Sequence, residues 1–217
     1  MSRRILLFGS AAVLGVAILA GALIYVNGNT QQTSRAADRN RAGLVQIHSP
    51  TLGNPEAKVH IVEFLDPACE TCASFYPYVK QILAANPDRV RLTLRLVPFH
   101  RGSDYVLKVL DAARKQGKFW QALEALLANQ SYWAANHTVQ TEYVWAPLEG
   151  LGLNIEQLKI DMNAPDVAQR IEQELKDAKA LKVTQTPEYF VNGRPLPSFG
   201  LEQLQTLVRE ELQAAYR

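Results

Sequence analysis

The chain has only two cysteines, and they lie three positions apart in Cys69-Glu70-Thr71-Cys72, shortly after an apolar run. A cysteine at the start of a helix meets unpaired backbone N–H groups and the positive end of the helix dipole, and both favour the thiolate. The thiolate is the form that reacts in thiol–disulfide exchange. The spacing therefore predicts a redox-active pair at a strand–helix junction.

Two other interpretations of the pair are half of a zinc site and two unrelated buried thiols. A structural zinc site needs four ligands, usually in two pairs. The chain has no second cysteine pair, and its four histidines are scattered, at His48, His60, His100 and His137. Spacing alone favours redox chemistry over both interpretations.

An uncharged run at residues 5–26 follows Arg3 and Arg4. As a helix rising about 1.5 Å per residue it would span roughly 33 Å, enough for the core of a bilayer. The run is longer than the apolar region of a signal peptide, so we expect an uncleaved anchor at residues 1–26. Cleavage at Ala22 is the alternative, because small residues end that part of the run.

Residues 27–42 are polar and lack a hydrophobic period, which predicts a linker between membrane and domain. Residues 43–217 suit one domain. A signal peptide and a signal anchor both export this domain, so we expect a single-pass protein of the bacterial inner membrane with its domain on the periplasmic side. Disulfides form and persist in that compartment. The formal net charge of +2 gives no indication of a nucleic-acid partner.

The hydrophobic pattern predicts an α/β domain that is interrupted by a helical insertion at about residues 103–182. The apolar, β-branched run Val59–Leu65 predicts a strand buried on both faces, and Asp66-Pro67 ends it. Further strands are expected at residues 90–97, 188–191 and 194–196, and helices at residues 69–85, 105–116, 119–127, 154–162, 165–181 and 201–212. In the helix after Pro165, one apolar stripe is expected to face the core, formed by Val167, Ile171, Leu175, Ala178 and Leu181.

This order of elements resembles the thioredoxin superfamily. The residues that carry the resemblance are Glu63-Phe64, the CxxC motif, and residues 183–193, which read Val-Thr-Gln-Thr-Pro-Glu-Tyr-Phe-Val-Asn-Gly. The helical block before the Thr-Pro pair is similar to that of the DsbA-like branch, the exported thiol:disulfide oxidoreductases. The resemblance covers residues 50–217 and implies a thioredoxin-like fold with a helical insertion.

The resemblance implies roles for five residues. Cys69 would be the exposed nucleophile and Cys72 the buried resolving thiol. Thr186 and a cis Pro187 would present backbone to an extended substrate. Glu63 lies in the strand at residues 59–65, and it is buried with a raised pKa if that strand is central. The resemblance implies that such an acidic residue relays protons to Cys72. The alternatives are a trans Pro187 and a solvent-facing Glu63 on an edge strand.

Glu70 and Thr71 stand where family members tune the pKa of the nucleophile. A carboxylate beside Cys69 repels the thiolate, and a less stable thiolate makes a less oxidising disulfide. We therefore predict a milder oxidant than the strongest family members. The alternative is that Glu70 points to water and is screened. Gln185 departs from the glycine that is common before the Thr-Pro pair.

The sequence thus predicts a membrane-tethered thiol:disulfide oxidoreductase that acts as an oxidase on cysteine pairs of exported proteins. It would be a monomer that a membrane redox partner recharges, with no metal and no cofactor beyond the Cys69–Cys72 disulfide. A reductase or isomerase of the same fold is one alternative, and a redox-inactive docking module is another. A third is a thiolate metal-binding protein, for which His60 or His100 would have to lie near Cys69.

Overall fold

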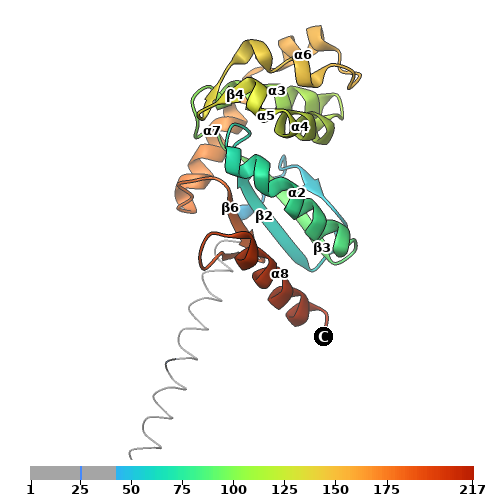
Figure 1. Ribbon diagram of the computed structural model, residues 1–217, viewed down its shortest axis with the longest axis vertical. Helices are drawn as coiled ribbons and strands as arrows, with labels where there is room; N and C mark the ends of the chain where they lie inside the picture. Colours follow the sequence, from blue (N-terminus) through green and yellow to red (C-terminus); the bar gives the residue numbers. More distant parts are fainter. Residues whose placement is uncertain (1–24, 26–42) are drawn as a thin grey trace, which may run out of the picture.

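The computed structural model describes Tyr25 and residues 43–217 (Figure 1). The predicted anchor at residues 1–26 and the predicted linker at residues 27–42 lie outside the described residues, apart from Tyr25. Within the part of the chain that is described, no helix combines the length and the hydropathy that a membrane span requires.

The centre of the domain is a mixed sheet with the strand order β1-β3-β2-β6-β7. Its strands are β1 (Thr51–Leu52), β2 (Val59–Leu65), β3 (Val90–Leu96), β6 (Glu188–Val191) and β7 (Arg194–Pro195). β2 pairs with β3 in parallel and with β6 antiparallel, so β2 is the central strand. Helix α2 (Glu70–Ala85) makes the crossover that a parallel pair requires.

A helical block separates β3 from β6, as predicted. Its elements are α3 (Ser103–Lys115), α4 (Phe119–Ala128), α5 (Gln130–Trp133), a hairpin of β4 (Ala134–Ala135) and β5 (Thr138–Val139), η1 (Thr141–Tyr143), η2 (Ala146–Leu148), α6 (Ile155–Asp161) and α7 (Pro165–Ala180). Figure 1 shows α3 to α6 gathered at one end of the sheet, by the start of α2. Helix α8 (Leu201–Ala215) closes the chain at the other end. The sequence pattern did not predict β1 or the β4–β5 hairpin.

The core lies on both faces of the sheet because side chains alternate along β2. Ile61 and Leu65 belong to the larger cluster, which α2, α3, α4 and α8 also line. Val62 and Phe64 belong to a smaller cluster on the opposite face. The prediction of a strand buried on both faces is therefore confirmed.

The predicted apolar stripe of α7 is wrong in part. Val167 and Ala178 are buried, but Leu175 is 39% exposed, and Glu174 is buried next to it. The reason is Arg95 of β3, which is fully buried and needs a carboxylate partner. Helix α7 therefore turns Glu174 rather than Leu175 toward the sheet.

Arg95 makes a buried polar cluster between the sheet and α7. Its Nε donates to Glu174 Oε2 at 2.6 Å, and its Nη2 donates to Asp177 Oδ2 at 2.5 Å. Its Nη1 donates to the carbonyl oxygens of Gly43 and Leu44, both at 2.8 Å. One guanidinium thus joins β3, α7 and the first described residues of the domain.

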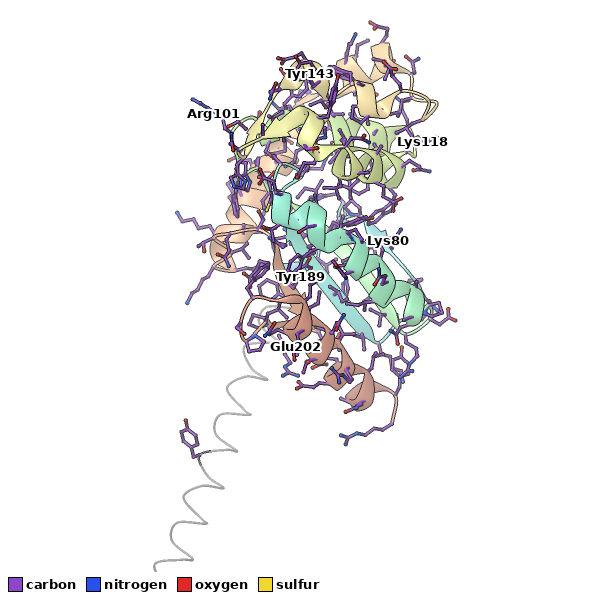
Figure 2. The ribbon with its side chains drawn as sticks, in the orientation of Figure 1. Lys80, Arg101, Lys118, Tyr143, Tyr189 and Glu202 are labelled. Carbon is purple, nitrogen blue, oxygen red and sulfur yellow. The ribbon has the colours of Figure 1, made fainter. Side chains whose placement is uncertain are left out.

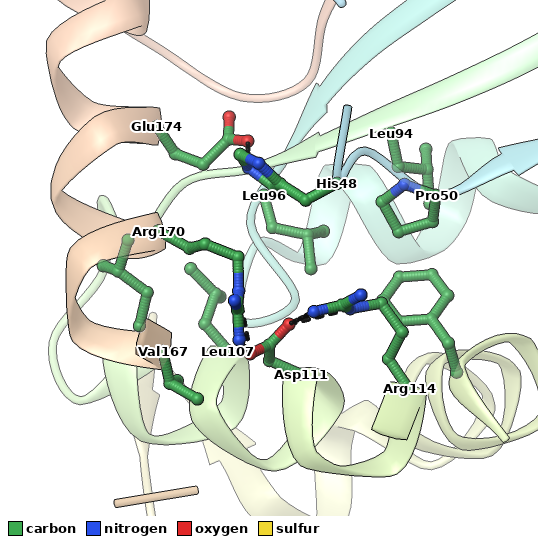
Figure 3. A pocket seen from close by; sticks show the side chains of 12 residues that line it. His48, Pro50, Leu94, Leu96, Leu107, Asp111, Arg114, Val167, Arg170 and Glu174 are labelled. Atoms are coloured by element: carbon green, nitrogen blue, oxygen red, sulfur yellow. Dashed lines mark hydrogen bonds and ion pairs between the residues drawn. The ribbon is translucent and has the colours of Figure 1, made fainter. Parts of the chain in front are cut away.

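A small pocket lies between the sheet and the helical block (Figure 3). On one side His48 Nε2 lies 2.9 Å from Glu174 Oε1. On the other, Arg114 of α3 and Arg170 of α7 both bind Asp111 of α3. The ion pair of Arg170 and Asp111 joins α7 to α3.

We expect Arg95→Met to be among the most destabilising changes in the domain. The substitution leaves Glu174 and Asp177 without their cation, and breaking a buried pair in this way costs about 3–5 kcal/mol. Guanidinium unfolding measures the loss. The control is Lys80→Gln, which removes the exposed ion pair of Lys80 and Glu124 and should cost less than about 1 kcal/mol. Equal effects of the two changes would contradict the prediction.

Candidate active site

The cysteine pair lies where β2 ends and α2 begins, as the sequence predicts. Cys69 is the residue before the first helical turn, with extended backbone at φ −81° and ψ 116°. Its N–H donates to the carbonyl oxygen of Asp66 at 3.0 Å, and its carbonyl oxygen accepts from the N–H of Ala73 at 3.2 Å. The Cys69 sulfur thus lies at the positive end of the α2 dipole, which favours a thiolate.

The buried carboxylate of Asp66 fixes the turn before Cys69. Its Oδ1 accepts from the N–H of Ala68 at 2.9 Å and from the Ser103 hydroxyl. Its Oδ2 accepts from the N–H groups of Phe99 and His100 at 2.7 and 2.8 Å, and it lies 2.7 Å from His100 Nδ1. Asp66 therefore joins the CxxC turn to the start of the helical block. From the sequence alone, Asp66 is predicted only to end the strand before it.

Cys69 is only 3% exposed, so the prediction of an exposed nucleophile is wrong for this structure. The loop before β6 covers the sulfur, and Cys69 Sγ lies 3.2 Å from the carbonyl oxygen of Thr186. Gln130 of α5 covers the backbone, because its Nε2 donates to the carbonyl oxygens of Pro67 and Cys69 at 2.6 and 2.9 Å. The loop and Gln130 therefore restrict the approach of a client sulfur to Cys69.

The Thr186–Pro187 peptide bond is cis, as the resemblance implies. Thr186 offers two groups to the Cys69 sulfur: its carbonyl oxygen accepts from the thiol, and its hydroxyl lowers the pKa of Cys69 by hydrogen bonding to the thiolate. That hydroxyl oxygen is buried and makes no hydrogen bond within the described residues, so it is available to donate to a Cys69 thiolate. The loop can therefore serve both protonation states of Cys69.

The two thiols have opposite pKa shifts, and both cysteines are free. The pKa of Cys69 is lowered to about 5, first because the Cys72 thiol hydrogen-bonds to it, and further by Thr186 and by the charge of His100, against an opposing effect of burial. The pKa of Cys72 is raised well above its ordinary value, chiefly by burial. The site thus favours a thiolate at Cys69 and a neutral thiol at Cys72.

Glu63 is fully buried in the central strand, which excludes the edge-strand alternative. Burial raises its pKa to about 8, against the opposing hydrogen bond from the Tyr189 hydroxyl to Glu63 Oε1 at 3.0 Å. Tyr189 comes from β6 (Figure 2). The second oxygen, Oε2, has no hydrogen-bond partner within the described residues. The charge of Glu63 also raises the pKa of Cys72, so the two groups are electrostatically coupled.

Of the two residues inside the motif, Glu70 is bound to another part of the fold, and Thr71 forms a hydrogen bond within α2. Glu70 Oε2 is paired with His137 Nδ1, and Glu70 Oε1 accepts from the N–H of His137 at 3.2 Å. Thr71 contributes its carbonyl oxygen, which accepts from the Ser74 hydroxyl at 3.0 Å. The hydrogen bonds found in residues 43–217 include none from the Thr71 side chain, so its predicted influence on the sulfurs stays a prediction.

The metal-binding alternative finds no support at the cysteines. In the described part of the chain, no three His, Cys, Asp or Glu side chains gather as metal ligands do. His60 is at the start of β2, and its Nε2 contacts Thr93 Oγ1 at 2.7 Å. His100 does lie near Cys69, but its Nδ1 is bound to Asp66.

Comparisons with known proteins identify the family of the chain. The family model described as thioredoxin matches residues 46–210. A thioredoxin-like oxidoreductase from Silicibacter pomeroyi DSS-3 has 34% identity and a TM-score of 0.69, over 81% of this chain and 99% of that one. The "probable disulfide bond formation protein D" of Bacillus cereus is 24% identical, over 98% of this chain and 99% of its own length.

A Na⁺/H⁺ antiporter, NhaA of Herminiimonas arsenicoxydans, is 30% identical over 144 residues, which are 66% of this chain. The match spans only 22% of the antiporter's length, so it relates this chain to one part of a longer protein. The thioredoxin model covers most of this chain; the chain therefore belongs to the thioredoxin family, and the predicted resemblance to its DsbA-like thiol:disulfide oxidoreductases is confirmed.

Proposed function

We propose that this chain oxidises cysteine pairs of exported proteins, and that Cys69 and Cys72 carry the exchanged disulfide. The opposite pKa shifts of the two thiols are the observation that carries the proposal. A stable Cys69 thiolate stabilises the reduced form, and a stable reduced form makes the disulfide an oxidant. This favours an oxidase over a reductase.

The exchange needs no group beyond the chain and the client. A client thiolate attacks Cys69 Sγ of the oxidised chain, the bond to Cys72 breaks, and Cys72 takes the electron pair and a proton. A second client thiolate attacks the client sulfur of this mixed disulfide, and Cys69 leaves as a thiolate. The client loses two electrons and gains a disulfide, and the chain is left with a Cys69 thiolate and a Cys72 thiol.

Glu63 is the group that we assign to the proton on Cys72. With a pKa of about 8 it is largely protonated at neutral pH and can give or accept a proton there. Its unpartnered Oε2 and its electrostatic coupling to Cys72 support this role.

Client docking is assigned to Thr186 and Pro187, together with two exposed aromatic side chains next to α2 and Asp66. The exposed ring of Phe199 stacks on Phe75 of α2, with centroids 5.0 Å apart. Phe99, also exposed, follows β3 and donates its N–H to Asp66. These two apolar side chains suit the unfolded, partly apolar segments that carry client cysteines.

The membrane tether and the cellular location come from the sequence alone. We propose that residues 1–26 anchor the chain in the bacterial inner membrane and that the domain works on its outer face as a monomer. The uncharged run at residues 5–26 supports this. A redox partner in the same membrane would accept the two electrons and restore the Cys69–Cys72 disulfide.

Trapping tests the assignment of the two cysteines. In Cys72→Ala the resolving thiol is gone, so mixed disulfides between Cys69 and clients should accumulate and appear on non-reducing gels. The matched control, Cys69→Ala, keeps only the fully buried Cys72 and should trap nothing. Equal trapping by both variants, or by neither, would contradict the assignment.

The redox state of the wild-type pair in the same cells tests the direction of the reaction. A Cys69–Cys72 pair found mostly reduced would favour a reductase.

The rate of alkylation of reduced Cys69 by iodoacetamide should rise with pH and level off above a midpoint near pH 5. The thiolate is the reactive form, and its lowered pKa sets this midpoint. An unperturbed cysteine has its midpoint at about 8.5. Mass spectrometry of the labelled peptide gives the rate, and a midpoint above 8 in the folded protein would exclude the stabilised thiolate.

Glu63→Gln should slow the attack of Cys72 on a Cys69–glutathione mixed disulfide by about tenfold or more, because the base that deprotonates Cys72 is lost. In the wild type this rate should rise with pH through about 8, as Glu63 ionises. This step in the pH profile should be absent from Glu63→Gln. Tyr189→Phe removes a hydrogen bond that favours the carboxylate, so the step should move to higher pH. Acid quenching and mass spectrometry follow the mixed disulfide. An unchanged profile in Glu63→Gln would assign the proton to another group.

A further inference from the structure

Glu70 ties the start of α2 to the tip of the β4–β5 hairpin. Both of its carboxylate oxygens contact His137, one through the ring Nδ1 and one through the backbone N–H. Glu70 is the second residue of the CxxC motif, and His137 comes 67 residues later, from the helical block. Figure 1 shows the hairpin strand β4 and α5 at the end of α2 where the helix begins.

His137 occupies a backbone position at which a glycine would be favoured. Asn136 and His137 have φ values of 49° and 56° and form the two-residue turn between β4 and β5. Turns with positive φ at both residues prefer Asn-Gly, because a side chain is disfavoured there. The ring contact with Glu70 is one that glycine, which has no side chain, could not provide.

The ring of His137 also stacks on His100, with centroids 4.6 Å apart. His100 does not depend on this stack for its position, because its Nδ1 and its backbone N–H are both bound to Asp66. The charge of His100 lowers the pKa of Cys69, whereas the Glu70 carboxylate is bound to His137. The carboxylate in the motif is therefore held by a partner of its own.

We propose that His137 is a positioning residue for the nucleophile, because it holds the Glu70 carboxylate against the hairpin and so limits its repulsion of the Cys69 thiolate. This inference rests on the proposed thiol–disulfide exchange. A carboxylate released beside Cys69 repels the thiolate and makes it less stable. The reduced form of the chain is then also less stable, so the disulfide becomes a weaker oxidant. The helical block thereby contributes to the oxidising strength of the CxxC motif.

The test compares the redox equilibrium with glutathione in four forms: wild type, His137→Gly, Glu70→Gln and the double variant. His137→Gly suits the positive φ and keeps the turn. We expect it to shift the equilibrium about threefold toward the oxidised chain, about 14 mV for a two-electron couple, as befits an exposed pair. The midpoint of Cys69 thiolate absorbance should move to higher pH in parallel.

Rescue decides the mechanism. Glu70→Gln alone should not weaken the oxidant, and in the double variant it should restore the equilibrium that His137→Gly disturbs, because no carboxylate is left to repel Cys69. We expect His100 to stay bound to Asp66 in all four forms, because its ring Nδ1 and its backbone N–H both contact that carboxylate. If His137→Gly changes nothing, or if its effect is the same with and without Glu70, the proposal is wrong.

Glu124→Gln is the matched control. Glu124 also bridges the helical block to α2, through Lys80, and its side chain is 44% exposed against 46% for Glu70. Removing it should leave the equilibrium unchanged, and a shift equal to that of His137→Gly would overturn the proposal. A wild-type chain that exchanges no disulfide with glutathione would reject the proposed function itself, whereas normal exchange without rescue rejects only the role of His137.

Discussion

The buried carboxylate of Asp66 is the interaction on which the rest of the site depends. Burying a carboxylate is costly unless hydrogen bonds replace the lost water. Here the donors come from three places: the turn before Cys69, the loop after β3, and Ser103 at the start of α3. The sheet, the CxxC helix and the helical block therefore meet at one group. Asp66 also orients His100, whose charge lowers the pKa of Cys69.

The two cysteines differ because α2 carries them into different surroundings. Cys69 precedes the first turn and lies among groups that favour a negative charge, namely the helix end, Thr186 and His100. Cys72 lies one turn further on, fully buried and coupled to Glu63. Cys69 is buried because the Thr186 loop lies against its sulfur. The same loop stabilises the thiolate, since Thr186 lowers the pKa of Cys69.

Much of the fold could be predicted from local patterns, because strands such as Val59–Leu65 and the hairpin turn Asn192-Gly193 carry their signal in consecutive residues. The burial of Glu63 was predictable for the same reason, since it lies inside such a strand. Long-range polar contacts were not predictable. Arg95 and Glu174 are 79 residues apart, and their ion pair turns Glu174 inward where periodicity predicts Leu175. Two-residue strands such as those around His137 have no pattern to detect.

Glu70 illustrates why a motif does not fix its own electrostatics. From the sequence, a carboxylate beside Cys69 predicts a weaker oxidant, because it repels the thiolate. In the fold the same carboxylate is bound by His137, a residue that periodicity and spacing did not connect to the motif. The repulsion therefore depends on the hairpin as much as on the motif. A reduction potential inferred from the two residues between the cysteines leaves out the partners that these residues find elsewhere in the fold, and in this chain one of them is paired with the helical insertion.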